Sequence, residues 1–216
     1  MSEQRLWKAC AIMALASAAI MLSFGPMPGM SECGGSDSII RFEFANSAAD
    51  VTSRVRNAAC AQGQYYALWW DTILFIPAYL TFLVLALLAL RGERRRLAAC
   101  GIVMAIAGAL ADQVEGTRLF AILANMPGEP AHFEVLFWAV RIKFGLLAGA
   151  TFVIALLLGA RRWVHWPAAA LIIVGSVTSI AGLITPDLPW ISLGGMLSWL
   201  PIIITAQVIA WRRKPS

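Results

Sequence analysis

Six ionisable residues lie in segments that are otherwise apolar enough to cross a bilayer. They are three acids and three bases: Asp71, Asp112, Glu115, Arg118, Arg141 and Lys143. One such charge at the centre of a membrane helix costs roughly 2.5 to 3.5 kcal/mol on insertion scales, so these residues need partners. Because they fall at similar depths on three neighbouring segments, the sequence predicts one buried polar site.

The spacing of these residues indicates which of them face each other. Asp112 and Glu115 are three residues apart and therefore share one helix face. Arg141 and Lys143 are two apart and cannot share a face. Lys143 lies deeper in its segment, so we expect it to meet the acids, while Arg141 faces another helix or extends outward to water.

A cluster of carboxylates in a low dielectric cannot be fully ionised at low cost. A carboxyl that titrates near neutral pH can act as a general acid, as a proton carrier, or only as a structural hydrogen-bonding group. Structural ion pairing therefore remains an alternative to a functional site. Asp71 has an alternative of its own, because it follows the aromatic segment 65–70, which is typical of a membrane interface where an aspartate reaches water. Pro77 favours a site, since it frees the carbonyl of Ile73 near Asp71.

The sequence predicts no metal and no cofactor. Its two histidines, His132 and His165, are assigned to opposite sides of the membrane, so haem or zinc held by paired histidines has no support. Binding of a hard cation by Asp71, Asp112 and Glu115 alone remains an alternative. The sequence contains no nucleophile motif and no phosphate-binding glycine loop.

Composition indicates a membrane protein. The chain has 216 residues, of which 60% are hydrophobic and 13% charged, against about 25% charged in an ordinary soluble domain. We expect an all-α, polytopic bundle forming a single transmembrane domain over 1–216. Six segments have the length that a span needs: 6–25, 66–90, 97–125, 133–160, 166–185 and 190–211. The first is interpreted as an uncleaved anchor, because no A-x-A cleavage pattern follows it.

Charge alternates between successive loops. The termini and every second loop are basic, through Arg5, Lys8, Arg91, Arg94, Arg95, Arg96, Arg161, Arg162, Arg212, Arg213 and Lys214. The alternate loops carry Glu32, Asp37, Glu43, Asp50, Glu129, Glu134 and Asp187. This is the positive-inside pattern, which predicts a multi-pass protein of the cell membrane, here the bacterial inner membrane, with both termini in the cytoplasm. It argues against nucleic acid as the partner of the basic residues.

The one long loop, 26–65, is assigned to the outer side. Ser47 and Asp50 have capping-box spacing, which predicts a short amphipathic helix over 47–61, either a lid over the site or a plain solvated helix. Cys33 and Cys60 lie in this loop and form a candidate disulfide if the outside is oxidising. Near the other end of the chain, two prolines predict a turn at 185–189.

Four stretches occur together in a characteristic order: Phe42-Glu43-Phe44-Ala45, Asp71 through Tyr79, Asp112-Gln113-Val114-Glu115, and Lys143-Phe144. In this the chain resembles a group of uncharacterised small bacterial membrane proteins with FE[LF]A, D…Y, DxxEN and KF stretches, over roughly 36–150. Gly116 stands where that group has Asn. The resemblance implies that Glu43 and Tyr79 act together with Asp71, Asp112, Glu115 and Lys143, and we expect Arg118 and Arg141 nearby.

Three classes of function fit these features. The first is binding or transformation of a lipid-like or isoprenoid molecule that enters sideways from the bilayer. The second is a proton- or ion-coupled small transporter, because intramembrane acids paired with bases are typical of proton relays. The third is a structural or accessory membrane subunit. The expected partners are the lipid bilayer and, in the first class, a small lipid-like molecule.

Overall fold

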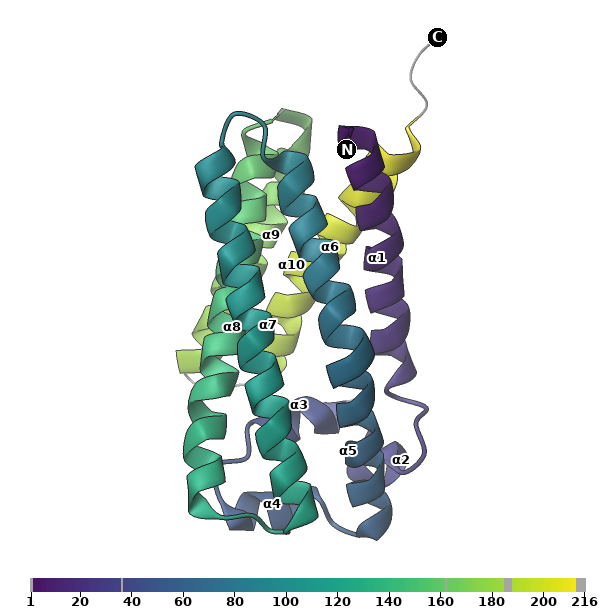
Figure 1. The fold of residues 1–216 in the computed structure, drawn as a ribbon, viewed down its shortest axis with the longest axis vertical. Helices are drawn as coiled ribbons and strands as arrows, with labels where there is room; N and C mark the ends of the chain where they lie inside the picture. Colours follow the sequence, from purple (N-terminus) through teal and green to yellow (C-terminus); the bar gives the residue numbers. More distant parts are fainter. Residues whose placement is uncertain (1, 36, 162, 185–187, 213–216) are drawn as a thin grey trace. The chain divides into compact units, whose positions relative to one another are not determined.

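The computed structural model describes residues 2–35, 37–161, 163–184 and 188–212, and the chain is all-helical over these ranges. Six helical segments are long and apolar enough to cross a membrane (Figure 1). They are α1 (Glu3–Ser23), the run α5 (Ala58–Trp70), η1 (Asp71–Phe75) and α6 (Ile76–Leu90), α7 (Arg95–Ala124), α8 (Pro130–Gly159), α9 (Trp166–Ile184) and α10 (Leu188–Trp211). The six predicted spans therefore coincide with six helices, within a few residues at most ends.

The exception is the start of the second span, where the prediction of one helix over 47–61 is wrong. The structure has α4 (Ala48–Arg54) and then a separate α5 that begins at Ala58 and continues into the span. Ser47 caps α4 by accepting a hydrogen bond from the Asp50 N–H at 3.2 Å, as the capping-box spacing predicted. Asn57 is a second cap, whose Oδ1 accepts from the Cys60 N–H at 2.8 Å. This second cap divides the predicted helix in two.

The chain divides into two units of internal contacts. Unit 1 comprises Met1–Ser17, Ala78–Gly108 and Phe144–Ser216, and unit 2 comprises Ala18–Pro77 and Ala109–Lys143. Helices α1, α6, α7 and α8 contribute residues to both units. The turn predicted at 185–189 falls largely outside the described residues, as do Arg162, Asp187, Arg213 and Lys214 from the charge pattern.

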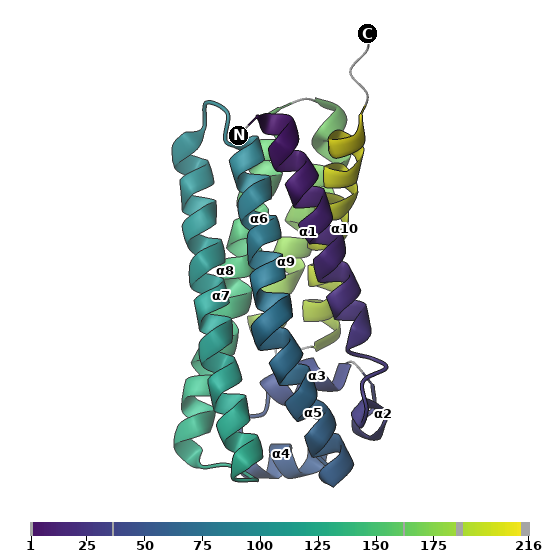
Figure 2. The same ribbon diagram turned by 45° about the vertical axis from the view of Figure 1, so that its right-hand side comes forward.

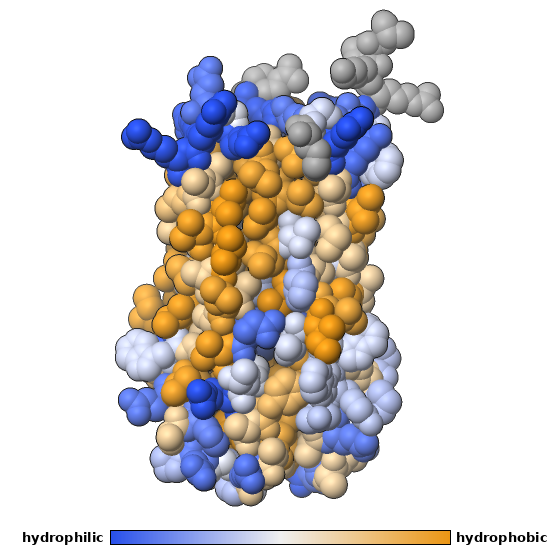
Figure 3. Space-filling model, in the orientation of Figure 1, coloured by the Kyte–Doolittle hydropathy of each residue, from blue (hydrophilic) through white to orange (hydrophobic). Residues whose placement is uncertain are grey.

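Unit 1 is held together by close helix packing. Figure 1 shows α9 and α10 running side by side. Gly175 makes this approach tight, because a Cβ there would lie 2.5 Å from the backbone nitrogen of Ser198. Buried Thr151 and Ser176 join α8 to α9 through hydroxyls 2.9 Å apart. Over the helices of unit 1 the surface in Figure 3 is mostly hydrophobic, with hydrophilic residues gathered at one end. Small residues at helix contacts and an apolar exterior are typical of membrane helices.

Unit 2 contains the short helices α2 (Met30–Cys33), α3 (Asp37–Glu43) and α4 in addition to parts of the long ones. In both ribbon views α2 lies beside α5 (Figures 1 and 2). Gly29 and Gly63 permit this contact, since a Cβ on Gly63 would lie 2.7 Å from the backbone carbon of Gly29. A small apolar cluster of Phe24, Met30 and Ala67 fills the space behind it.

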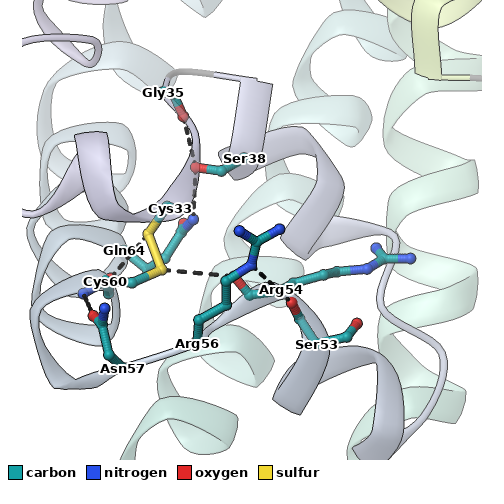
Figure 4. The surroundings of a disulfide bond; sticks show 9 residues. All are labelled: Cys33, Gly35, Ser38, Ser53, Arg54, Arg56, Asn57, Cys60 and Gln64. Atoms are coloured by element: carbon teal, nitrogen blue, oxygen red, sulfur yellow. Dashed lines mark hydrogen bonds between the residues drawn. A yellow bond between two sulfur atoms is a disulfide. The ribbon is translucent and has the colours of Figure 1, made fainter.

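A disulfide fixes the same region. Cys33 at the end of α2 is bonded to Cys60 in α5, with their Cα atoms 5.0 Å apart (Figure 4). Next to it, Gln64 of α5 donates a hydrogen bond at 3.0 Å to the hydroxyl of Ser38 in α3. The disulfide and this hydrogen bond together tie the loop helices α2 and α3 to the long helix α5.

Candidate functional site

Three carboxyl groups of unit 2 converge on one lysine. The Lys143 ammonium lies 2.9 Å from Glu43 Oε2, 3.2 Å from Asp112 Oδ1 and 2.8 Å from Glu115 Oε2. It also donates a hydrogen bond to Glu115 Oε1 at 2.9 Å. We call these four residues the acid–lysine cluster. All four are buried, so their charged groups are not solvated by bulk water.

Three helices build the acid–lysine cluster. Lys143 comes from α8, whereas Asp112 and Glu115 come from one face of α7, as their spacing predicted. Glu43 is the last residue of the loop helix α3. The expected choice of Lys143 over Arg141 agrees with this arrangement. Glu43 was expected only around the site, yet it contacts the ammonium directly.

The cluster contains more acids than bases. Three carboxylates around one ammonium carry two excess negative charges, which a low-dielectric site tolerates poorly. Glu43 and Glu115 both contact the same ammonium, so their two carboxyls are held close together. Glu43 lies on α3, outside the spans, and burial raises its pKa above the ordinary 4.5, although Lys143 acts in the opposite direction. The acid–lysine cluster therefore contains more carboxyl groups than its single lysine can neutralise.

Asp71 lies at the edge of the cluster. It is partly exposed, and it interacts electrostatically with Asp112, Lys143 and Glu43. It begins the π-helical turn η1, and such turns are rare and frequently occur at functional sites. Asp71 is therefore a partly exposed carboxyl that is close enough to the buried charges to interact with them.

Gln113 is a residue near the site that sequence reasoning missed. Its Nε2 donates a hydrogen bond at 3.1 Å to the backbone carbonyl of Thr72 in η1. Pro77 was expected to free the carbonyl of Ile73, which follows from α-helical spacing. In η1 the Ile76 N–H bonds to Asp71 O, five residues back, so in this register the carbonyl facing Pro77 is that of Thr72. Gln113 supplies the donor that proline lacks.

Arg141, Arg118 and Tyr79 are the remaining residues that were expected at the site. Arg141 folds back on its own helix, where it donates to Phe137 O at 3.1 Å and its guanidinium lies 3.4 Å from the Phe137 ring centroid. Arg118 is partly buried, and its Nε has no hydrogen-bond partner in the described part of the chain. Tyr79 belongs to unit 1, where its ring packs 5.5 Å from that of Trp199.

The donor set of the acid–lysine cluster does not suit a metal ion. Within residues 2–35, 37–161, 163–184 and 188–212, no group of three or more His, Cys, Asp or Glu side chains is arranged to hold a metal. The physical reason at the acid–lysine cluster is that the Lys143 ammonium occupies the point on which the three carboxyls converge. Hard cations require oxygen ligands around that point.

An open groove of about 420 Å³ lies in the same unit. Its walls come from the chain between α3 and the start of α4, from the loop before α8 and from the first turns of α8, the helix that carries Lys143. The lining is mostly apolar and consists of Asn46, Ser47, Ala48, Gly128, Pro130, Phe133, Glu134 and Phe137. Phe137 in this groove is the ring against which Arg141 packs.

Comparison of the chain with protein-family models, with curated proteins and with solved structures found no match. The function therefore has to be argued from the geometry of the site.

Proposed function

We propose that this protein is a multi-pass membrane protein whose acid–lysine cluster takes up and releases protons, and that this exchange drives the movement of a small molecule or ion. The observation that carries the proposal is the convergence of three buried carboxyls on the single ammonium of Lys143. Buried acids paired with a base inside membrane helices are typical of proton relays in pumps and transporters.

The excess of acid distinguishes a proton site from a structural ion pair. One carboxylate would neutralise Lys143, and a second would already exceed it. Apolar residues of similar volume stabilise a bundle at least as well as a buried ion pair does. The additional carboxyls are best explained by a role in which their protonation changes. Glu43 Oε2 and Glu115 Oε2 lie 2.9 and 2.8 Å from the same ammonium, so a proton on one of the two carboxyls would relieve the repulsion between them.

Glu43 is the carboxyl that can connect protonation to movement. It is the only member of the cluster on a loop helix, whereas the other three lie on the long helices α7 and α8. Because the Glu43 pKa is raised when α3 is in place, a proton on Glu43 favours that position, and loss of the proton allows α3 to separate from α8. A proton-dependent contact of this kind is a two-state element of the sort that alternating access requires.

A second candidate function is binding of a lipid-like molecule. The observation that favours it is the apolar groove at Phe133 and Phe137, which is formed by the chain after α3 and by α8, the helix that also carries Lys143. A ligand in this groove would lie along the side of α8 that Arg141 covers through its contact with Phe137. Occupation of the groove would then act on the cluster through α8.

We further propose that both termini are cytoplasmic and that the loop 26–57 lies outside, in the bacterial inner membrane. The positive-inside distribution supports this orientation. On a background without the free cysteines Cys10 and Cys100, a cysteine placed at Asp37 should react with an impermeant reagent added to intact cells. A cysteine at Glu93 should react only after the membrane is opened. Labelling at Glu93 in intact cells would overturn the orientation.

The proton proposal is tested by the titration of Glu43. Its raised pKa means that the folded protein holds this proton to higher pH than the unfolded chain does. Glu43 therefore stabilises the fold fully below pH 4.5, and this contribution is lost as the pH rises through the raised pKa. Glu43→Gln keeps the side chain neutral at every pH, so the variant should lose this part of the pH dependence of the unfolding temperature.

Infrared spectroscopy of the protein in lipid bilayers reports the same event directly. The wild type should show a protonated-carboxyl band that disappears as the pH is raised from 4.5, and Glu43→Gln should remove or shift it. Glu32→Gln, which alters an exposed acid in the neighbouring helix α2, is the matched control and should leave the band unchanged. A wild type whose buried carboxyl bands do not respond to pH would overturn proton exchange and leave the structural role.

A further inference from the structure

A second cluster of charge lies in unit 1, away from the acid–lysine cluster in sequence and opposite to it in sign. There a pocket of about 390 Å³ is lined by Arg161, His165, Ile209 and Arg212. Arg161 follows the end of α8, His165 ends the short helix η2 (Trp163–His165), and Arg212 follows the end of α10. Two guanidinium groups and an imidazole therefore share one hollow with a single aliphatic side chain.

The surroundings of the pocket resemble a membrane interface. The Lys8 ammonium lies 5.5 Å from the ring centroid of Trp211, next to Arg212. Trp166 and Trp211 are both exposed, at the ends of spanning helices. Exposed tryptophan and basic side chains at span ends are typical of the headgroup level of a bilayer.

We propose that this pocket binds the phosphate group of an anionic lipid. Guanidinium groups match phosphate oxygens with paired, parallel hydrogen bonds, which makes arginine the preferred residue for such sites. Basic pockets between membrane helices are known to take anionic headgroups. Ile209 adds an apolar wall, which an inorganic phosphate would not use but the glycerol and acyl part of a lipid would contact.

One acid moderates the site. Glu3, in the first turn of α1, forms an ion pair with Arg161. A phosphate that binds Arg161 must therefore compete with this carboxylate. Glu3 sets the affinity of the pocket without forming part of its lining.

The experiment uses the purified full chain in a non-ionic detergent and a short-chain phosphatidic acid as the probe, with binding measured by calorimetry. Parallel arms use phosphatidylcholine of the same chain length and inorganic phosphate. Phosphatidic acid should bind more tightly than either. Replacing Arg161 and Arg212 by Gln should weaken its binding by about fivefold for each arginine removed. A pocket variant that binds phosphatidic acid as tightly as the wild type would overturn the proposal.

Two matched controls separate the pocket from general surface charge. Arg94→Gln with Arg95→Gln removes the same charge from another basic loop of unit 1, and should change the affinity little. Glu3→Gln should tighten binding because it frees Arg161, whereas Glu93→Gln, which neutralises a loop acid elsewhere in unit 1, should not. Equal loss in the Arg94 and Arg95 control would show non-specific attraction and would overturn the site. Equal affinity for inorganic phosphate would overturn the assignment to a lipid.

Discussion

Units 1 and 2 use opposite kinds of buried polar groups. Unit 2 contains nine acidic and six basic residues, a formal charge of −3, and it buries one lysine among three carboxyls. Unit 1 contains three acidic and eleven basic residues, a formal charge of +8. Its buried polar side chains, over the described residues, are hydroxyls: Ser17, Thr151, Ser176, Ser179, Ser198 and Thr205.

The two units differ in the partners that their buried polar groups require. A buried hydroxyl can be satisfied within its own helix, as Ser176 donates to Ile172 O at 2.8 Å and Ser198 to Gly194 O at 2.9 Å. Such groups let helices approach closely and need no charged partner. A buried ammonium needs carboxylates from other helices, and Lys143 draws them from α3 and α7. Packing therefore explains the polar groups of unit 1, whereas the excess of carboxyls in the acid–lysine cluster is what the proposed proton exchange would account for.

The largest expected effect is an asymmetry within the cluster. Lys143→Met leaves three buried carboxyls without a base, and removing one partner of a buried pair typically costs about 3 to 5 kcal/mol. Glu115→Gln keeps the shape of the side chain and lowers the excess negative charge, so it should cost much less. Unfolding by heat or denaturant in a mild detergent measures both free energies.

The control for this asymmetry is a double variant that removes Lys143 and one of its acids together. Lys143→Met with Glu115→Leu still leaves Glu43 and Asp112 without a base, so this double variant should recover only part of the lost stability. Adding Glu43→Gln and Asp112→Asn should recover most of the rest. If Lys143→Met and Glu115→Gln were equally harmful, the cluster would behave as a simple ion pair and the contrast with unit 1 would weaken.

The next effect concerns the disulfide of unit 2. Replacing both Cys33 and Cys60 by Ala removes the link from α2 to α5 and should cost about 2 to 4 kcal/mol. Because α3 follows α2 directly, the variant should also increase hydrogen exchange in residues 37–43. Cys100→Ala is the control, since this cysteine is free and exposed. Unchanged exchange in α3 would mean that the contact of Glu43 with Lys143 and the hydrogen bond from Gln64 suffice to hold it.

The stability of unit 1 should depend on side-chain volume at helix contacts, whereas that of unit 2 depends on buried charge. Gly175→Ala places a Cβ against the backbone of Ser198, so α9 and α10 must separate, and overpacking of this kind costs about 1 to 3 kcal/mol. Gly195→Ala lies on α10 with nothing within 4 Å of the added carbon, and should be neutral or slightly stabilising. The melting temperatures of the Gly175→Ala and Gly195→Ala variants measure this difference. Equal values would show that the α9 and α10 contact is not tight.

The spans and part of the site could be predicted because the signals are local. Hydropathy indicates which helices are long and apolar enough to span a membrane. Helix spacing puts Asp112 and Glu115 on one face, and the deeper position of Lys143 in its span favours it over Arg141 as the partner of the acids. Periodicity could not place Glu43, because the position of α3 depends on the disulfide and on the hydrogen bond between Gln64 and Ser38. Only the resemblance pointed to it. The break between α4 and α5 at 55–57 could not be predicted, because an Asn in a polar stretch is not by itself a signal for a helix cap.

The smallest expected effect tests η1, the π-helical turn that begins at Asp71. Gln113→Leu removes the donor to Thr72 O, and loss of one such hydrogen bond costs about 1 kcal/mol. Because Pro77 has no N–H to take its place, η1 should loosen, and hydrogen exchange of residues 71–76 should increase. Thr117→Val, one turn further along α7, removes only a bond to its own helix at Val114 O and should leave η1 unchanged. Unaltered exchange in the Gln113 variant would show that η1 is held by neighbouring helices alone, and Asp71 would then owe its place at the edge of the cluster to helix packing, as the polar groups of unit 1 do.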